Sequence, residues 1–341
     1  MESSCKFIFN PEHDLCLASG DVNFIPPASA VRFAQEGKWI ERFMRAPGGV
    51  ADNGSGSGSC SCSGSGNCAS QVVPWGWNAV LKCKLIGEGW PLEMLPSDEE
   101  LEFIRENSRR EVAVELLERL QEDKAMEAPA MSAKILPSTY RIIAKSLEEI
   151  ESFLGQYNRI VLKAPLSGSG KGVRFVTGEL METDRGWCRK TIQKQGAVIV
   201  EHRMEIQQEF AMLFECAPAE RVIFRGYSMF YTSNGAYKGN ILASDEYIEN
   251  RLAKWVPKEM LHKLQAEIAR WLDKKLQGRY TGFVGVDMFI SEGGILNPAM
   301  EINMRMTMGL IARNIYDYHK EEYNLGEGTH CFEPERGICK L

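Results

Sequence analysis

The chain has 341 residues, of which 44% are hydrophobic and 25% charged, and its formal net charge is −6. Such a chain can bury a large core, which excludes disorder over most of its length. The acidic balance excludes nucleic acid as the main partner, and no apolar run is long enough to span a membrane, so we expect neither as a partner. The charged N-terminal residues lack the apolar stretch of a signal peptide, and we therefore expect a cytoplasmic protein. Composition leaves the oligomeric state open.

The first part of the chain predicts an α/β unit. Residues 6–11 are expected to form a short buried strand that ends at a proline, and residues 26–46 and 79–85 to form helices. Residues 48–70 are dominated by Gly and Ser, and this composition cannot offset the entropy lost on ordering. We therefore expect a flexible loop between these helices.

The ten cysteines are expected to be reduced, because a chain of this length without an export signal favours free thiols. Cys60, Cys62 and Cys68 cluster in the Gly/Ser segment. Their spacing matches no standard zinc pattern and no histidine lies nearby, so an exposed loop is favoured over a metal site.

A pair of helices is expected over residues 95–123. Ser97 and Glu100 form a capping box at its start, and residues 107–108 mark a break between the two helices. Residues 124–138 contain two prolines and have the composition of a linker, so we place the main domain boundary there.

The remainder of the chain alternates strand and helix patterns typical of an α+β domain rich in antiparallel strands. Helices are expected over 146–154 and 258–277, and strands over 159–165, 173–177, 197–202, 209–215, 221–232, 238–244, 282–290 and a stretch ending at 300–305. The predicted fold class is therefore α/β plus α+β.

Residues 161–173, VLKAPLSGSGKGV, form the first segment that suggests chemistry. Lys163 leaves a strand, and Gly168, Gly170 and Gly172 follow it. Glycines allow backbone N–H groups to approach phosphate oxygens, and the lysine adds a point charge. The pattern is not a Walker A loop, which needs Gly five residues before Gly170 and Ser or Thr after Lys171, where this chain has Pro165 and Gly172. It is not a Rossmann fingerprint either. Alone, the segment also fits a flexible turn.

Residues 198–210 form the second segment. A strand ends at Glu201, a short connector follows, and another strand begins at Glu209. Such a connector can present backbone groups to the edge of an adenine, while the later carboxylate accepts hydrogen bonds from ribose hydroxyls. On its own the segment fits an ordinary solvated loop better.

Residues 284–305 form the third segment. Glu301 and Asn303 are two residues apart on one strand, so they share a face, and Asp287 lies on the preceding strand. Two carboxylates and an amide oxygen are ligands suited to Mg²⁺. The alternative is the polar outer face of a hairpin, and the strongly apolar neighbours on both strands count against it.

The register of this hairpin decides whether the metal hypothesis can hold. A two-residue turn would make Asp287 face away from Glu301. A three-residue turn over 292–294 would pair Asp287 with Ala299, diagonal to Glu301 on the same face, and a bulge at Pro298 would have the same effect. The hypothesis requires one of these two local structures.

In this order and at these separations, the three segments resemble the motifs of the ATP-grasp superfamily, whose fold holds ATP between two α+β subdomains after an N-terminal α/β domain. The resemblance implies an N-terminal domain over 1–125 and ATP-grasp subdomains over 126–205 and 206–341. It implies that Lys163 contacts the α- and β-phosphates. The loop that closes over the phosphates would comprise Ser167, Gly168, Ser169, Gly170, Lys171 and Gly172.

The same resemblance implies the remaining contacts to the nucleotide. Glu201, His202 and Arg203 match the hinge that reads adenine, with His202 contributing mostly its backbone, and Glu209 matches the carboxylate that binds ribose. A further basic residue usually contacts ATP from the helix before the linker, and Arg109 and Arg110 both fit this position.

Asp287, Glu301 and Asn303 match the ligands of two Mg²⁺ ions, for which Mn²⁺ can substitute. Arg305 resembles the arginine that faces the reacting carboxylate. Arg225, on a neighbouring strand, is a second candidate for that role, and a partly buried structural ion pair is the equal alternative for it.

The function implied by the resemblance is an ATP-dependent ligase. A substrate carboxylate would attack the γ-phosphate to give an acyl phosphate and ADP, and an amine or thiol would then displace phosphate. The expected partners are therefore a small-molecule carboxylate and an amine. Two alternatives stay open: a kinase acting on a hydroxyl, and a non-catalytic protein that binds ATP as a regulatory ligand.

Two N-terminal segments, FNPEHDL and PWGWN, match no substrate signature. If the amine enters from the N-terminal domain, the candidates to contact it are His13, Asp14, Trp75, Trp77 and Asn78. A tryptophan pair belongs more often to the core than to a substrate platform.

Overall fold

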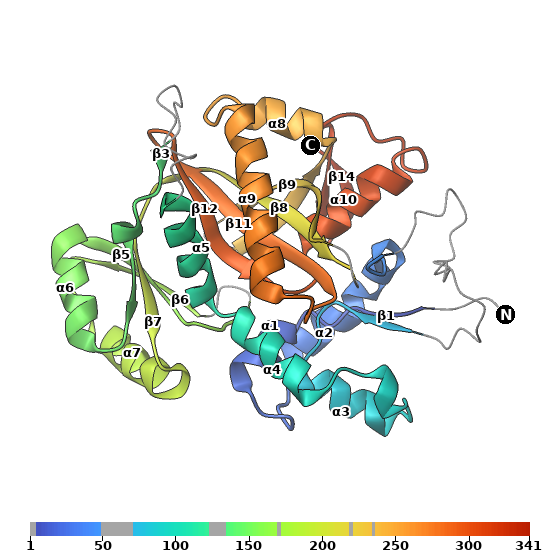
Figure 1. Cartoon of the computed structure of the whole chain (residues 1–341), viewed down its shortest axis with the longest axis horizontal. Coiled ribbons are helices and arrows are strands. Elements are labelled where there is room, and N and C mark those ends of the chain that lie inside the picture. Colours follow the sequence, from blue (N-terminus) through green and yellow to red (C-terminus); the bar gives the residue numbers. More distant parts are fainter. Residues whose placement is uncertain (1–4, 49–70, 123–133, 169–171, 218–220, 234–235) are drawn as a thin grey trace.

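The computed structural model describes residues 5–48, 71–122, 134–168, 172–217, 221–233 and 236–341. The loop expected at 48–70, with Cys60, Cys62 and Cys68, lies outside the described residues except for Gly48, and so do residues 169–171 of the glycine-rich segment. The described chain is built on a two-stranded, a four-stranded and an eight-stranded sheet (Figure 1).

The N-terminal part combines a parallel strand pair with short helices. Strand β1 (Lys6–Ile8) pairs with β2 (Val72–Pro74). The helices around this pair are α1 (His13–Ser19), α2 (Ala28–Glu36), the 3-10 helix η1 (Gly37–Phe43), α3 (Ala79–Gly87), the 3-10 helix η2 (Leu92–Met94) and α4 (Asp98–Asn107). At the start of α4, Ser97 and Glu100 each accept a hydrogen bond from the other's backbone N–H, which confirms the predicted capping box.

The four-stranded sheet is antiparallel and has the order β4-β7-β5-β6. Its strands are β4 (Arg141–Ala144), β5 (Arg159–Lys163), β6 (Val173–Thr177) and β7 (Val198–His202), and helices α6 (Leu147–Tyr157) and α7 (Glu182–Gln195) cover one face (Figure 1). Because side chains alternate along a strand, Leu162 and Val200 pack against these helices. Lys163 and Glu201 consequently lie on the opposite face, which is turned towards the eight-stranded sheet.

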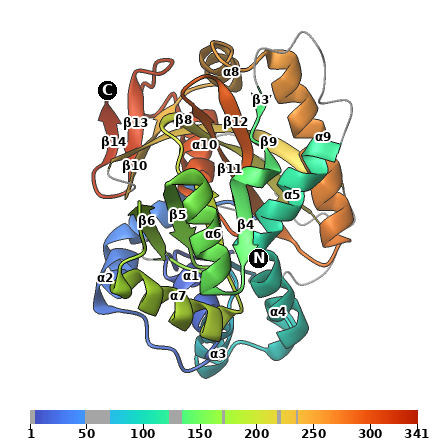
Figure 2. The ribbon, with the colours of Figure 1, turned by 90° about the vertical axis from the view of Figure 1, so that its left-hand side faces the viewer.

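The eight-stranded sheet has the order β14-β13-β10-β9-β8-β11-β12-β3. Its strands are β3 (Lys134–Ile135), β8 (Ile206–Cys216), β9 (Ile223–Ser233), β10 (Ala236–Leu242), β11 (Gly282–Ser291), β12 (Ile295–Asn303), β13 (His330–Glu333) and β14 (Gly337–Lys340). Helices α5 (Arg110–Glu122), α8 (Asp245–Leu252) and α9 (Lys258–Leu276) pack on one face, and α10 (Met308–His319) with η1 packs on the other (Figures 1 and 2). Along β8, Phe210 and Met212 face the first group of helices, whereas Ala211 and Leu213 face the second.

The β11–β12 hairpin contains both features that the sequence analysis offered as alternatives. Ile290 pairs with Leu296, so the turn has three residues, 292–294. A bulge then shifts the register, and Asp287 pairs directly with Glu301. The predicted pairing of Asp287 with Ala299 is therefore wrong by two residues. The prediction that Asp287 and Glu301 share a face is confirmed, because a register shift of two residues leaves each side chain on the same face of its strand.

The predicted fold class, α/β plus α+β, is confirmed by this arrangement. The apolar stripe predicted on 258–277 is buried along α9. Helix α7 was not predicted, because it packs mainly through Cys188 and Thr191 and has no continuous apolar stripe. Helix α5, expected in the N-terminal domain, packs against β12 of the eight-stranded sheet.

The expectation that all thiols are reduced is wrong for Cys5, which is disulfide-bonded. Six other cysteines of the described residues are free: Cys16, Cys83, Cys188, Cys216, Cys331 and Cys339. Burial raises the pKa of the Cys16 thiol to about 12, so this buried thiol stays protonated and unreactive.

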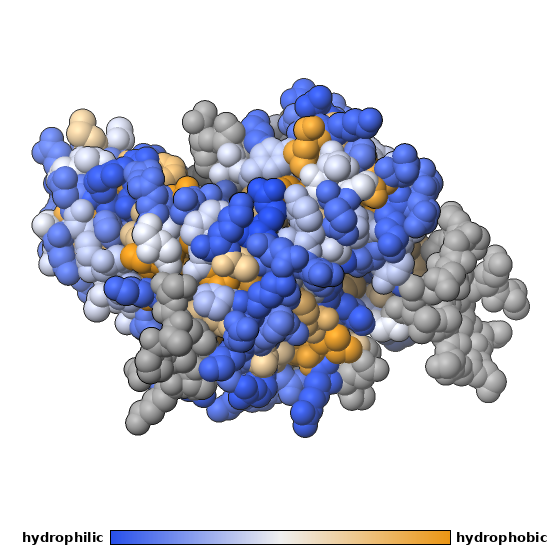
Figure 3. Space-filling model, turned by 90° about the horizontal axis from the view of Figure 1, so that it is seen from above, coloured by the Kyte–Doolittle hydropathy of each residue, from blue (hydrophilic) through white to orange (hydrophobic). Residues whose placement is uncertain are grey.

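The surface agrees with the composition. On the face seen in Figure 3, hydrophilic side chains predominate and hydrophobic ones occur in small groups. Within the described residues, none of the helices is both long and apolar enough to cross a membrane.

Gly76 provides a test of how tightly α1 is docked. A Cβ at this position would lie 2.7 Å from the ring of His13, which is buried and cannot move aside freely. Gly76→Ala should therefore destabilise the protein by about 1–3 kcal/mol. Gly155→Ala in α6, where a Cβ would meet no atom within 4 Å, should instead stabilise by about 0.5–1 kcal/mol. Thermal unfolding of the two variants measures both effects, and equal melting temperatures would contradict the docking described here.

Candidate active site

Lys163, Glu201 and Arg141 form a buried charge network on the inner face of the four-stranded sheet. Lys163 Nζ lies 2.7 Å from one carboxylate oxygen of Glu201, and Arg141 Nε lies 2.9 Å from the other. Burial lowers the pKa of Lys163, and the Glu201 carboxylate opposes this shift. Burial would raise the pKa of Glu201, but the charges of Arg141 and Lys163 outweigh it and hold that pKa below its usual range. An ionised glutamate thus lies between the two cationic side chains and offsets the effect of burial on the pKa of Lys163.

Arg110 links this side of the site to the eight-stranded sheet. It is the first residue of α5, and its side chain donates to Ser167 Oγ at 2.8 Å and to Glu301 Oε1 at 3.0 Å. It also donates to the carbonyl oxygen of Ala164. Of the two candidates for the extra basic residue, Arg110 therefore reaches the site, whereas Arg109 pairs with Glu111.

The three predicted metal ligands lie together at the β11–β12 hairpin. Asp287 is the cross-strand neighbour of Glu301, and Asn303 Nδ2 donates to Asp287 Oδ2 at 3.0 Å. Burial and then the charge of Glu301 raise the pKa of Asp287 to about 7. Two carboxylates that repel each other beside an amide oxygen form a donor set that suits Mg²⁺. No group of three His, Cys, Asp or Glu side chains able to hold a metal occurs in the described part of the chain, and in this set the third donor is an amide.

Arg305 joins β12 to the N-terminal helix α1. Its guanidinium forms a two-bond ion pair with Asp14, at 2.9 and 2.8 Å, and donates to Asn303 Oδ1 at 2.9 Å. The FNPEHDL segment thereby contributes a side chain to the site. The PWGWN segment supports it, because the Trp75 carbonyl accepts a hydrogen bond from the Met306 backbone N–H, next to Arg305.

His202 and Arg203, the residues predicted to form the hinge, lie at the end of β7, where the chain passes from the four-stranded to the eight-stranded sheet. The His202 ring stacks on Tyr157, with ring centroids 4.8 Å apart, and meets Tyr140 edge-on. Arg203 lies over the Phe175 ring. Both side chains are therefore held by the four-stranded sheet and its helices, and the Arg203 backbone N–H donates to the carbonyl oxygen of Arg159 at 3.0 Å.

Glu209 and Arg225 have different surroundings. Glu209 accepts a hydrogen bond from Thr232 at 2.7 Å, and burial raises its pKa. Arg225 pairs with Glu215 at 2.6 Å, which is the structural ion pair given above as its alternative. None of the described contacts brings Arg225 to Lys163, Glu301 or the other predicted site residues.

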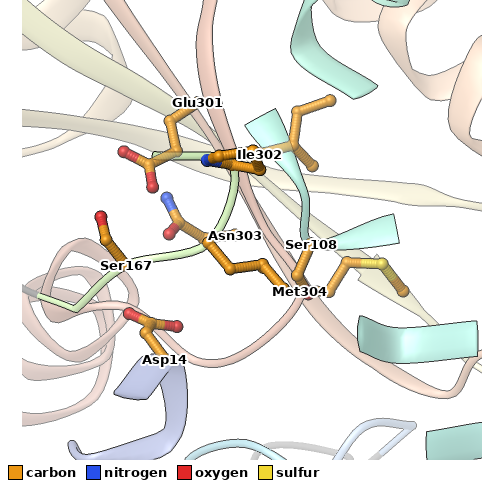
Figure 4. Close-up of a pocket in the computed structure, with 9 residues that line it drawn as sticks. Asp14, Ser108, Ser167, Glu301, Ile302, Asn303 and Met304 are labelled. Carbon is orange, nitrogen blue, oxygen red and sulfur yellow. The ribbon is translucent and has the colours of Figure 1, made fainter. Parts of the chain in front are cut away.

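A pocket lies between these groups (Figure 4). Its lining comes from α1, the α4–α5 junction, the segment after β5 and the end of β12: Asp14, Ser108, Pro165, Leu166, Ser167, Glu301, Ile302, Asn303 and Met304. In Figure 4 the polar ends of Asp14, Ser167, Glu301 and Asn303 point towards one another. A Cβ on Gly168 would collide with Leu15, so the glycine-rich segment begins in direct contact with α1.

Sequence reasoning missed Arg141 and left Asp14 among several candidates. Arg141 lies on a strand of four residues outside all three motifs, and its alternation with Ile142 and Ile143 is a weak signal. Asp14 and Arg305 are 291 residues apart, so no local pattern could join them.

Comparisons with known proteins give distant likenesses. No protein-family model matches, and no curated protein matches. Among solved structures, the chain is similar to the biotin carboxylase domain of Hydrogenobacter thermophilus 2-oxoglutarate carboxylase, crystallised with MgADP and bicarbonate (14% identity, 72% of this chain, 53% of that chain, TM-score 0.49). It is also similar to Campylobacter jejuni biotin carboxylase (13% identity, 76% of this chain, 54% of that chain, TM-score 0.49). A third similar structure is Thermus thermophilus N5-carboxyaminoimidazole ribonucleotide synthetase (15% identity, 94% of this chain, 79% of that chain, TM-score 0.44). The chain spans about half the length of the first two of these (53% and 54%).

Magnesium affinity should depend on pH through Asp287. Because its pKa is raised to about 7, the carboxyl carries a proton below that pH which the metal must displace. Affinity for Mg²⁺ should therefore rise by up to about tenfold per pH unit on the acid side and level off above about pH 7. Calorimetric titration of the ADP-bound protein with Mg²⁺ across this range measures the effect, and Asp287→Asn should abolish the pH dependence. A flat profile in the unmodified protein would contradict the assignment.

The raised pKa of Asp287 also predicts how the stability of the metal-free protein depends on pH. A raised pKa means that the folded state binds this proton more tightly than the unfolded state, so the stabilisation is present at acid pH and is lost as the pH rises through about 7. Asp287→Asn should accordingly raise the melting temperature of the metal-free protein at alkaline pH more than at acid pH. Equal increments at both pH values would show that Asp287 is ionised throughout.

Lys163→Ala should weaken ATP binding by about 1–3 kcal/mol, because a charge-assisted contact to phosphate is lost. Lys190→Ala, an exposed change in α7, is the control and should leave affinity unaltered. The dissociation constant for ATP is measured for both variants at equilibrium. An unaltered affinity in Lys163→Ala would contradict the prediction that Lys163 contacts the phosphates.

Proposed function

We propose that this chain is an ATP- and Mg²⁺-dependent ligase of the ATP-grasp type that joins a carboxylate to an amine through an acyl phosphate. The observation that carries the proposal is the position of Arg110. Its hydrogen bonds to Ser167 and Glu301 place the start of the glycine-rich segment directly beside the paired carboxylates of β11 and β12. A phosphate group held by that segment would therefore lie next to a divalent cation.

The proposed reaction has two steps. An oxygen of the substrate carboxylate attacks the γ-phosphorus, the bond to the bridging oxygen breaks, and ADP leaves. The amine nitrogen then attacks the acyl carbon, the bond from carbon to the phosphate oxygen breaks, and phosphate leaves with the proton that the amine loses. Both steps move negative charge, so they depend on groups that neutralise it.

The residues present can supply that neutralisation. Lys163 and Arg110 would provide positive charge beside the glycine-rich segment, and Arg141 shares the Glu201 partner of Lys163. Asp287, Glu301 and Asn303 would hold Mg²⁺, which stabilises charge on the transferred phosphoryl group. His202 and Arg203, whose side chains contact Tyr157 and Phe175, would form the hinge that reads adenine, and Glu209 would accept hydrogen bonds from the ribose hydroxyls.

Trapping with hydroxylamine tests the first step without knowledge of the amine. Hydroxylamine attacks an acyl phosphate at carbon and releases phosphate, which leaves a stable hydroxamate. The protein is incubated with ATP, Mg²⁺, hydroxylamine and a panel of carboxylic acids, and hydroxamate and ADP are measured together. Matched formation of both supports the ligase. ADP with a phosphorylated hydroxyl compound and no hydroxamate indicates the kinase, and the absence of ADP indicates the regulatory alternative.

Glu301→Gln should reduce phosphoryl transfer by roughly 10²–10³-fold, because the change removes one negative charge from the metal site and keeps the side-chain volume. Folding should survive, since the side chain is 29% exposed and lines the pocket. ADP release at saturating ATP gives the rate, and the melting temperature serves as the control for folding. Equal rates in the two proteins would favour the regulatory alternative.

A further inference from the structure

The position of Asp14 in the pocket depends on contacts between helix α1 and the PWGWN segment. Its helix, α1, is fixed at its start by Asn10, whose side chain donates to the carbonyl oxygen of Gly76 at 2.9 Å. The ring of His13 packs so closely on Gly76 that no Cβ fits between them. The position of Asp14 is thus set by the two N-terminal segments that matched no substrate signature.

The ion pair with Arg305 leaves the carboxylate, and not the guanidinium, available to a ligand. Arg305 donates to Asp14 through Nε and Nη2, to Asn303 through Nη2 and to the carbonyl oxygen of Met306 through Nη1. Four of its five N–H groups are therefore committed. Each oxygen of Asp14 accepts one of these hydrogen bonds and keeps a second lone pair, and Asp14 lines the pocket whereas Arg305 does not.

Asp14 remains a carboxylate in this setting. Burial alone would raise its pKa, but the adjacent charge of Arg305 outweighs burial and lowers it. His13 adds no positive charge, because burial lowers its pKa to about 4 and its Nδ1 lies 3.3 Å from the Asn78 amide. Glu12, on the other side, has a pKa raised by burial.

The accessible lining of the pocket is acceptor-rich. It contains the carboxylates of Asp14 and Glu301, the hydroxyls of Ser108 and Ser167 and the amide of Asn303. None of the nine residues that line it is Lys, Arg or His. Arg305 and Arg110 pair with the two carboxylates from outside this lining, so a group that fills the space is favoured when it brings hydrogen-bond donors to their remaining lone pairs.

An ammonium group fits the Asp14 end of the pocket better than a second metal ion. Arg305 already holds a positive charge within 3 Å of this carboxylate and would repel a dication more strongly than a monovalent cation. An aliphatic ammonium offers two or three N–H donors, which match the free lone pairs of Asp14 and the Ser167 hydroxyl. The opposite end of the pocket, at Glu301 and Asn303, is the part assigned to Mg²⁺.

We infer that Asp14 recognises the amine substrate as a protonated aliphatic amine and makes the pocket selective for cationic acceptors. The bound ammonium releases one proton to solvent, which frees the nitrogen lone pair for attack on the acyl carbon, and the second proton leaves with phosphate. This inference rests on the proposed ligase function and specifies the chemical class of the second substrate. It also assigns to the FNPEHDL segment the selection of the acceptor, in addition to its pairing with Arg305.

The experiment compares a charged acceptor with an uncharged one in the same enzyme. At neutral pH hydroxylamine is mostly uncharged, whereas alkylamines are cations. With the acid found by hydroxamate screening, amide formation is measured with ammonium, methylamine, ethylenediamine and the standard amino acids, and hydroxamate formation is measured in parallel. Asp14→Asn, which keeps the shape and removes the charge, should lower the ratio of amide to hydroxamate by about 10- to 100-fold through a higher KM for the amine.

Two further variants make the comparison specific. Asp14→Glu restores the charge and should recover part of the ratio, while Asp21→Asn removes a charge from an exposed position after α1 and should leave the ratio as in the unmodified protein. A parallel fall of amide and hydroxamate in Asp14→Asn would overturn the inference, because Asp14 would then act only by positioning Arg305. Hydroxamate without amide from any of these cationic amines would overturn it as well. The absence of hydroxamate in the unmodified protein would instead refute the ligase function itself, and the inference with it.

Discussion

One buried arginine holds together the parts on which the proposed chemistry depends. Arg110 is 6% exposed, and it reaches Ala164 and Ser167 with one terminal nitrogen and Glu301 with the other. An uncompensated buried charge costs about 3–5 kcal/mol, so the partners on both sheets are constrained to stay within reach of it. This constraint sets the separation between the lysine that would bind phosphate and the carboxylates that would bind metal. Helix α5 itself packs on the eight-stranded sheet through buried apolar residues such as Leu116 and Leu120.

Each cationic side chain of the site has a carboxylate partner. Lys163 and Arg141 share Glu201, and Arg305 is held by Asp14. A triphosphate would compete with Glu201 for Lys163, and a divalent cation would relieve the repulsion between Asp287 and Glu301. At the proposed site, the metal and the nucleotide would therefore favour each other's binding, since each would compensate a charge that the other exposes.

The sequence predicts what is local and fails where contacts join distant segments. Strand alternation placed Glu301 and Asn303 on one strand face, and the helix expected over 258–277 is α9. A bulge at Pro298 was offered only as an alternative to the three-residue turn, whereas the direct pairing of Asp287 with Glu301 depends on both together. Arg141 enters the network through its position in the strand order β4-β7-β5-β6, which becomes apparent only when the sheet is assembled. The disulfide at Cys5 shows that chain length and composition were insufficient to judge the state of every thiol.

The turn of the β11–β12 hairpin has a consequence for how this protein can evolve. Gly293 and Gly294 both have positive φ angles, 82° and 73°, which other residues adopt only with strain. Side chains alternate along each strand, so the gain or loss of a single residue in this turn would reverse the faces of one strand relative to the other. Asp287 would then point into the core and Met288 into the cleft. Length variation in this turn is therefore as restricted as replacement of the carboxylates themselves, although the turn itself touches none of the groups in the pocket.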